Sequence, residues 1–237
     1  MSQHLPFEVT ISISRTDEGA RQTFNVPVAS QATRVLDALL FVREHLDPSV
    51  GFRFSCRAGM CGSCAVVING KEALACQTAI ASLNSREISI SPLRALPVIR
   101  DLVTDMAPFF KTFKSSHAAL KAKNPDNRLP QVLPPGSTRR QLIERQNGCV
   151  TCGACYSACE WSSSRPGYLG PAALNRVLML ALDERDEDGL NRLDQIGVAD
   201  GALRCHGLGN CSVVCPIEIP LSEGMDTLKG LLANVGS

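Results

Sequence analysis

The chain has few aromatic residues and almost no net charge. Phenylalanine, tryptophan and tyrosine make up 5% of its 237 residues, and the formal net charge is +1 at pH 7. A nearly neutral chain exerts no bulk electrostatic attraction on nucleic acid or on anionic lipid. We therefore expect no nucleic-acid partner.

Long apolar runs are also missing. Apolar stretches such as Val177–Leu182 are far shorter than the roughly 20 residues that a membrane-spanning helix needs. Residues 1–6 contain no basic region followed by an apolar core, so we expect no secretory signal. A protein that is not exported stays in a reducing compartment, where disulfides are rare.

Cysteine is the residue type that the chain has in excess. The eleven cysteines fall into three clumps, and an odd number does not suit a fully paired disulfide framework. The first clump has the C-x4-C-x2-C…C spacing of plant-type [2Fe–2S] ferredoxins. It consists of Cys56, Cys61, Cys64 and Cys76.

The loop of the first clump favours a cluster over a zinc ion. Gly59 and Gly62 can take positive φ and turn backbone N–H groups toward the sulfides. The alternatives are a zinc site or four unrelated core thiols. A zinc knuckle usually offers two separated C-x2-C pairs, whereas three thiols share one loop here. We therefore predict a complete [2Fe–2S] site.

The second and third clumps are interpreted together. The second has the C-x2-C-x2-C-x3-C spacing of two-cluster bacterial ferredoxins and consists of Cys149, Cys152, Cys155 and Cys159. The third consists of Cys205, Cys211 and Cys215, with Pro216 directly after. In two-cluster ferredoxins the fourth cysteine of each run binds the other cluster. This crosswise rule predicts a [4Fe–4S] site formed by Cys149, Cys152, Cys155 and Cys215.

The remaining cluster has one thiolate too few. It receives Cys159, Cys205 and Cys211, and the position where the run would place another cysteine holds Leu208. Leucine offers no ligand, so we predict a [3Fe–4S] cluster rather than a four-iron cluster completed by water or another side chain. The three sets use all eleven cysteines and leave none for nucleophilic catalysis.

The apolar periodicity predicts an α+β protein that begins with a β-grasp domain. Residues 8–14, 22–28, 65–68 and 87–91 are predicted strands, with a turn at Asn69 and Gly70. Thr33 is predicted to cap a helix, and a further helix is predicted after Pro97. The sequence thus predicts a β-grasp [2Fe–2S] ferredoxin-like domain over residues 1–107.

The second half of the chain is predicted to be helical. From Lys114 to Thr138 the chain is polar, basic and rich in proline, which is typical of a linker that runs over the surface, and we predict this linker over residues 108–138. Beyond it, the predicted helices cover residues 139–146, 171–183, 189–196 and 221–233. They alternate with the cysteine motifs and indicate an α-helical ferredoxin domain over residues 139–237.

These motifs resemble those of the iron–sulfur subunit of succinate dehydrogenase or fumarate reductase. The resemblance is carried by residues 55–65, 68–70, 97–105, 149–159, 168–172 and 204–216. It implies [2Fe–2S], [4Fe–4S] and [3Fe–4S] clusters in that spatial order. They would relay electrons between the FAD of a flavoprotein subunit, which carries the active site, and a quinone held by a membrane anchor subunit. It also implies a peripheral position on the cytoplasmic face of the inner (plasma) membrane.

The acceptor end departs from the family pattern. Glu160 stands where the family commonly has proline, and Ser163 and Ser164 stand where many quinone-linked members have a tryptophan pair. His206 matches a family histidine near the three-iron cluster and the quinone. We predict His206 and Trp161 in the quinone vicinity, with Trp161 packing rather than binding the quinone.

Two other functions are consistent with the sequence. One is the same kind of subunit in a related flavoprotein complex with a non-quinone donor or acceptor. The other is a zinc-stapled interaction module without redox activity.

Overall fold

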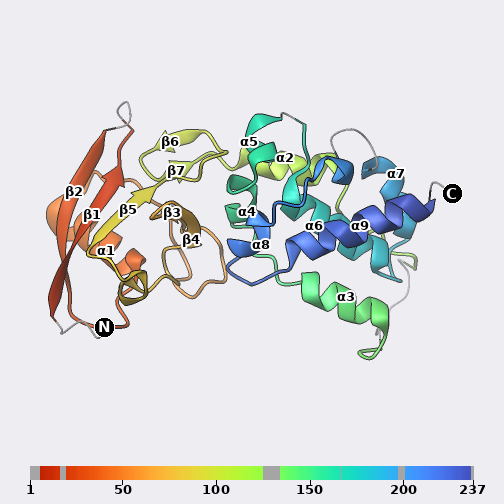
Figure 1. The fold of residues 1–237 in the computed structure, drawn as a ribbon, viewed down its shortest axis with the longest axis horizontal. Coiled ribbons are helices and arrows are strands. Elements are labelled where there is room, and N and C mark those ends of the chain that lie inside the picture. Colours follow the sequence, from red (N-terminus) through yellow and green to blue (C-terminus); the bar gives the residue numbers. More distant parts are fainter. Residues whose placement is uncertain (1–5, 17–19, 125–133, 166, 197–200, 236–237) are drawn as a thin grey trace. The chain divides into compact units, whose positions relative to one another are not determined.

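The computed structural model describes residues 6–16, 20–124, 134–165, 167–196 and 201–235 (Figure 1). By its internal contacts the chain divides into two compact units. The first comprises Met1–Met106 together with Val150–Ala158. The second comprises Ala107–Cys149 together with Cys159–Ser237. Each unit has its own buried core.

The first unit is built on a five-stranded mixed sheet with the strand order β2-β1-β5-β3-β4. The central strands β1 and β5 are parallel, and the other neighbouring strands pair antiparallel. Helix α1, Val35–Phe41, follows β2 and continues as the π-helical turn η1, Val42–Leu46. This order is that of a β-grasp fold. The strands are β1 Phe7–Ser14, β2 Arg21–Val28, β3 Ala65–Ile68, β4 Lys71–Leu74 and β5 Glu87–Ser91.

Alternation of apolar and polar residues explains the strands. In β1 the buried side chains are Phe7, Val9, Ile11 and Ile13, and the intervening residues are at least partly exposed. The predicted strands are therefore confirmed. The predicted cap at Thr33 is wrong by one residue, because Arg34 occupies the N-cap and donates its N–H to Asp37 over 2.8 Å. A 3₁₀ turn, η2 Ile80–Leu83, precedes β5.

The helix predicted after Pro97 is wrong, and the segment forms a short hairpin instead. Strands β6, Val98–Arg100, and β7, Val103–Thr104, pair antiparallel around Asp101, whose φ is +49°. The Asp101 carboxylate is buried and accepts hydrogen bonds from Gly51 N at 2.7 Å and from Arg15 Nε at 3.1 Å. β-Branched residues favour strands, and these distant donors hold the turn in place.

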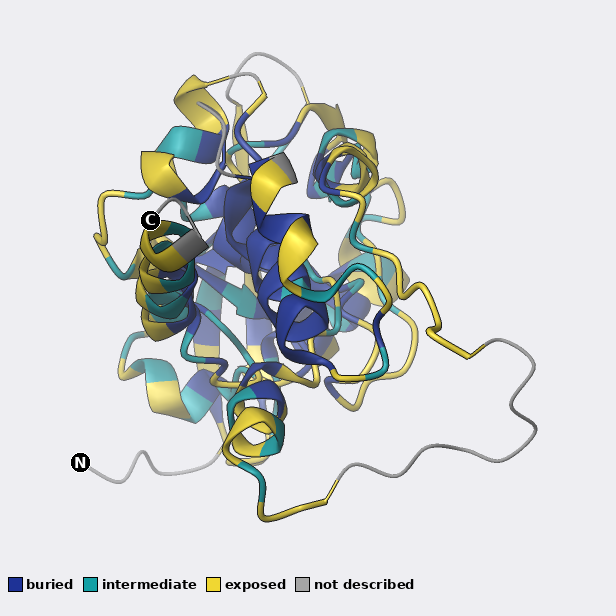
Figure 2. Ribbon diagram, turned by 90° about the vertical axis from the view of Figure 1, so that its right-hand side faces the viewer, coloured by how far each residue is buried: buried dark blue, intermediate teal, exposed yellow. Residues whose placement is uncertain are grey.

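The second unit is a set of helices around α6, Gly170–Leu182. Every residue of α6 except Arg176 is buried, as expected for a helix that is apolar all round, and Pro171 lies in its first turn. Buried residues gather in the interior helices of Figure 2. The surrounding helices are α2 Ala107–Ser115, α3 Thr138–Gln146, α5 Glu160–Ser164, α7 Arg192–Ile196, α8 Asn210–Val213 and α9 Leu221–Val235. The 3₁₀ turns are η3 Gly189–Asn191 and η4 Ala202–Arg204.

The four helices predicted beyond the linker are confirmed, with α7 preceded by η3. Helix α2 falls within the predicted linker. Its Phe109 is fully buried and the helix packs on α6, so this part of the range belongs to the helical core. Residues 125–133 of the predicted linker lie outside the described residues. None of the described helices is both long and apolar enough to cross a bilayer.

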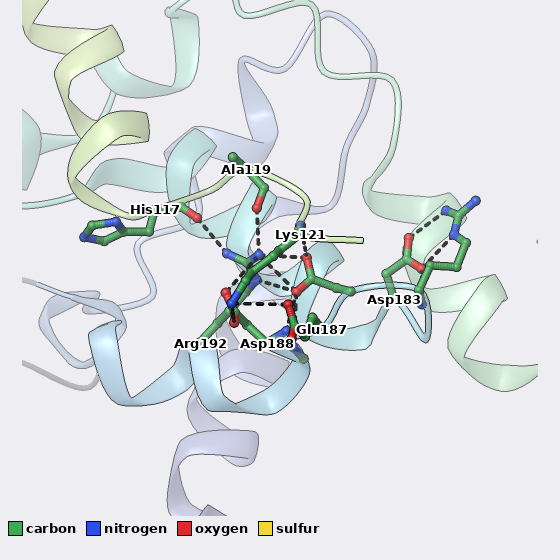
Figure 3. Close-up of polar contacts among 10 residues, drawn as sticks. His117, Ala119, Lys121, Asp183, Glu187, Asp188 and Arg192 are labelled. Carbon is green, nitrogen blue, oxygen red and sulfur yellow. Dashed lines mark hydrogen bonds and ion pairs between the residues drawn. The ribbon is translucent and has the colours of Figure 1, made fainter. Parts of the chain in front are cut away.

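A buried ion pair fastens the segment after α2 to the loop after α6. Arg192 Nη2 lies 2.8 Å from Asp186 Oδ2, and both side chains are almost fully buried. The same guanidinium donates to the carbonyl oxygens of His117 and Ala119, each at 2.6 Å (Figure 3). A buried guanidinium is tolerated when a carboxylate and further acceptors satisfy it. We refer to these four residues as the Arg192 clamp.

Candidate iron–sulfur centres

The loop before β3 wraps its backbone around the sulfur of Cys56. The amides of Ala58, Met60 and Cys61 point at Cys56 Sγ, with N···S distances of 3.4, 3.3 and 3.3 Å. Positive φ angles of +76° at Gly59 and +70° at Gly62 allow the tight turn, as predicted. Amide donors of this kind stabilise a thiolate that binds iron and help to set cluster potentials.

Sheet register brings the distant fourth cysteine to this loop. Strands β3 and β4 pair Ala65 with Leu74, so Cys64 and Cys76 lie at adjacent strand ends. The amide of Ala75 donates to the carbonyl of Cys64 over 3.1 Å, which continues the ladder by one step. The hairpin turn at residues 69–70 therefore fixes which part of the chain returns to the loop.

The thiols of this group have different surroundings. The Ser63 hydroxyl, 3.1 Å from Cys61 Sγ, together with nearby amides lowers the pKa of the exposed Cys61 thiol to about 6. Burial, together with the charges of Cys76 and Cys61, raises the pKa of the Cys64 thiol to about 12. These mutual effects mean that the three thiols lie together. Iron would supply the positive charge needed to keep the buried thiols deprotonated.

The predicted [4Fe–4S] cysteines are divided between the two units. Cys152 and Cys155 belong to the first unit, and Cys149 and Cys215 belong to the second. Cys155 lies on the short helix α4, Ala154–Ser157. The amide of Ile219 donates to Cys215 Sγ over 3.4 Å, as a ligand sulfur would require. The complete set stays a prediction.

The three cysteines predicted for the third cluster gather within the second unit. Burial raises the pKa of the Cys211 thiol to about 11, and the charges of Cys159 and Cys205 contribute to this shift. These residues come from α8, the start of α5 and the end of η4. Leu208, at the position without a thiol, leaves 62% of its surface exposed. The donor set of three thiols fits a cluster with three irons.

The structure stacks the two residues predicted near a quinone on each other. The rings of Trp161 and His206 have centroids 4.8 Å apart and planes inclined by 30°. Cys159, Cys205 and Trp161 all pack against the hydrophobic core of the helical unit. Ser163 and Ser164 stand where many relatives have a tryptophan pair. Both hydroxyls donate to the carbonyl of Glu160 at 2.8 Å, so these hydrogen bonds stay within helix α5.

Sequence reasoning missed two polar residues at these sites. The guanidinium of Arg165 lies 5.5 Å from the indole centroid of Trp161, a cation–π contact signalled by their four-residue separation. Ser63 lies between the proposed ligands Cys61 and Cys64, and this position in the sequence was the one sign that its hydroxyl could contact a ligand sulfur. Among the described residues, no three His, Cys, Asp or Glu side chains converge closely enough to hold a single metal ion. The cysteines of an iron–sulfur cluster bind different irons, so they lie farther apart than the ligands of one ion.

The fold and the sites define an iron–sulfur protein built from two ferredoxin-like parts. Residues 9–111 match the family described as "2Fe-2S iron-sulfur cluster binding domain", and residues 145–219 match the "4Fe-4S dicluster domain". These matches confirm the α+β class with a [2Fe–2S] ferredoxin-like domain followed by a domain for two clusters.

Relatives that match most of the chain indicate the family more specifically. The mitochondrial succinate dehydrogenase [ubiquinone] iron–sulfur subunit 1 of Oryza sativa subsp. japonica is 36% identical over 231 residues, covering 94% of this chain and 81% of the relative. The fumarate reductase iron–sulfur subunit of Mycobacterium tuberculosis is 35% identical over 195 residues, covering 82% and 78%. The chain belongs to the family of iron–sulfur subunits of succinate dehydrogenase and fumarate reductase, which are oxidoreductases.

A solved structure supports the fold independently. A chain of the Mycobacterium smegmatis Sdh1 complex in the apo form superposes with a TM-score of 0.85 over 97% of both chains, at 24% identity. The two-part architecture described above is therefore that of a known structure.

Proposed function

We propose that the chain carries single electrons between the FAD of a flavoprotein subunit and a quinone. The carriers are a [2Fe–2S], a [4Fe–4S] and a [3Fe–4S] cluster. The observation that carries this proposal is the gathering of Cys159, Cys205 and Cys211 from distant parts of the chain, with Leu208 where a fourth thiol would stand. The missing fourth thiol, and with it a three-iron cluster at the end of the relay, distinguishes this chain from an ordinary two-cluster ferredoxin.

Each cluster has a proposed set of ligands. The [2Fe–2S] cluster is held by Cys56, Cys61, Cys64 and Cys76. The [4Fe–4S] cluster is held by Cys149, Cys152, Cys155 and Cys215. The [3Fe–4S] cluster is held by Cys159, Cys205 and Cys211. When bound, the clusters supply the one-electron chemistry, and the chain supplies thiolates, amide donors and burial that tune their potentials.

The partners follow from the two ends of the relay. A flavoprotein subunit, which would hold the succinate or fumarate site, docks beside the [2Fe–2S] domain. A membrane anchor subunit with its quinone receives the [3Fe–4S] end, and the complex lies on the cytoplasmic face of the inner membrane. His206 and Trp161 contribute to the quinone vicinity, and the chain itself has no catalytic residue.

The test is anaerobic purification of the complex with its flavoprotein, followed by low-temperature EPR and quinone-linked succinate oxidation. The proposal expects signals of all three clusters and electron transfer from succinate to quinone. A protein with zinc in place of iron and sulfide would overturn it.

An alternative function is favoured by Ser163 and Ser164, which replace the family's tryptophan pair. In this alternative, the complex reduces an acceptor other than a quinone. Succinate-dependent reduction of a dye at the flavin, without any reduction of quinone, would favour this alternative.

A further inference from the structure

The loop of the first cluster touches the second cysteine motif inside the first unit. Gly62 lies between Cys61 and Cys64. A Cβ built on Gly62 would lie 2.6 Å from the carbonyl oxygen of Val150 and 2.8 Å from Cα of Cys152. Real Cβ atoms essentially never approach other atoms this closely, so no other residue fits without moving the backbone.

The other end of the second motif is fastened to the same unit. Ser157, at the end of α4, donates its hydroxyl to the buried carboxylate of Glu72 over 2.9 Å. The same hydroxyl accepts the amide of Arg94 at 2.8 Å, and Arg94 Nε lies 3.7 Å from Glu72. Glu72 is on β4, the strand that leads to Cys76. Segment 150–158 is therefore docked at both ends onto elements that carry the first cluster's cysteines.

The geometry points to the contact between Gly62 and Cys152 as the electron link between the first two clusters, with Gly62 as its positioning residue. This inference rests on the proposed function, because it takes Cys61 and Cys64 as [2Fe–2S] ligands and Cys152 as a [4Fe–4S] ligand. With both clusters bound, one electron would pass from the cluster held by Cys61 and Cys64 to the cluster held by Cys152, and no bond would form or break. The flavoprotein supplies the electron.

Close packing is the physical reason that this contact matters. Electron tunnelling weakens steeply with distance and weakens more across empty space than through bonded and packed atoms. A glycine lets two backbones approach more closely than any other residue does. An added methyl group at Gly62 pushes the loop away from Cys152 and lengthens the gap between the two ligand sets.

The same loop contains a matched control. Gly59 has a similar positive φ, +76°, so alanine is strained there to the same degree. The three atoms nearest to its added Cβ all belong to the side chain of Gln77, at 3.0–3.2 Å, and that side chain also donates to Cys76 Sγ over 3.6 Å. Gly59→Ala thus reproduces the backbone strain of Gly62→Ala without separating the two motifs.

The experiment compares both variants with wild type in the complete complex with its flavoprotein. EPR measures the magnetic interaction between the reduced [2Fe–2S] and [4Fe–4S] clusters, redox titration gives their potentials, and freeze-quench after a succinate pulse gives the rate at which the second cluster is reduced. We expect Gly62→Ala to weaken the interaction and slow the transfer while both potentials stay unchanged. Gly59→Ala, which strains the same loop without a clash against Val150 or Cys152, should change both measurements much less than Gly62→Ala does.

Several outcomes overturn the inference. Equal interaction and rate in the two variants would do so, because strain alone would then account for any effect. A wild-type complex whose two clusters show no magnetic interaction would do so even if Gly62→Ala fails to assemble, and would leave the proposed relay intact. Absence of either cluster from wild type would instead overturn the proposed function.

Discussion

The indole of Trp161 lies stacked on the imidazole of His206, with 4.8 Å between the ring centroids. Trp161 follows Cys159 by two residues, and His206 follows Cys205 directly. The stack thus joins two segments that each provide a proposed ligand of the three-iron cluster. The two residues are therefore neighbours in the structure although they are far apart in the sequence.

The stack predicts unequal effects of changing its two members. Trp161→Phe keeps an aromatic ring against His206, so quinone reduction should fall by no more than about tenfold, or ~1.4 kcal/mol of barrier. His206→Ala should cost more, because it removes a polar group next to the last cluster. Reduction of a dye at the flavin serves as the control and should be unaffected by either change. A collapse of quinone reduction in Trp161→Phe, with three intact EPR signals, would show that the indole itself binds the quinone.

Leu208→Cys should convert the three-iron cluster into a four-iron cluster. The exposed leucine would be replaced by a thiolate at the missing corner, and the added negative charge should lower the cluster potential. EPR of the oxidised protein should lose the [3Fe–4S] signal, and iron analysis should rise by one atom per chain. Four irons already present at this site in wild type would refute our interpretation of position 208.

The crosswise ligand sets predict which cluster each cysteine supports. Cys215→Ser should damage the [4Fe–4S] cluster first, although Cys215 is far from residues 149–155 in sequence. Cys159→Ser should damage the three-iron cluster first, since it removes a proposed ligand that lies near Cys211. EPR of both variants checks this. The reverse pattern would mean that each run completes its own cluster.

Asp101 should stabilise the first unit throughout the neutral pH range. Burial raises the pKa of this carboxyl, but the amide of Gly51, the hydroxyl and amide of Thr16 and the charge of Arg15 outweigh it and hold the pKa below its usual 3.8. A lowered pKa means that the stabilisation is present above the usual value and is lost only as pH falls through the folded-state pKa.

The matching variant is Asp101→Asn, which replaces an acceptor of several hydrogen bonds with a side chain that also donates. It should lower the free energy of unfolding by about 2 kcal/mol or more. Denaturant unfolding at several neutral pH values should show a constant difference from wild type. A difference that varies with pH in this range would contradict the assigned pKa direction.

The Arg192 clamp should stabilise the second unit through its buried charge. Asp186→Asn leaves the buried guanidinium with only the more exposed Asp188 carboxylate, 3.5 Å away, as its counter-charge. Removing the main partner of a buried ion pair typically costs about 3–5 kcal/mol, so we expect a loss toward the lower end of that range. Loss of helical circular dichroism on heating measures this. Lys121→Ala is the control, because Lys121 pairs with Glu187 and Asp188 at the surface and its loss should leave unfolding nearly unchanged. Equal effects of the two changes would show that the buried ion pair is not what stabilises this loop.

The proposed set of clusters and most of the secondary structure follow from local sequence. Most of the cysteines that bind iron–sulfur clusters come in runs of characteristic spacing, so these runs can be recognised in the sequence, although a cluster may also take a ligand from a distant run. Strand β1 and helix α6 are equally local, because alternating or all-round apolar residues determine which faces become buried. The [2Fe–2S] loop, with Gly59 and Gly62 at positive φ, was predictable for the same reason.

Long-range contacts decided the rest. The hairpin at residues 98–104 forms because donors from Arg15, Thr16 and Gly51 converge on Asp101, and no local pattern encodes them. Segment 150–158 joins the first unit through Gly62 and Glu72, although it is remote from both in sequence. The Trp161–His206 stack is of the same kind. Sequence spacing determines which side chains can bind a cluster, whereas packing between distant segments determines which cysteine motifs come into contact.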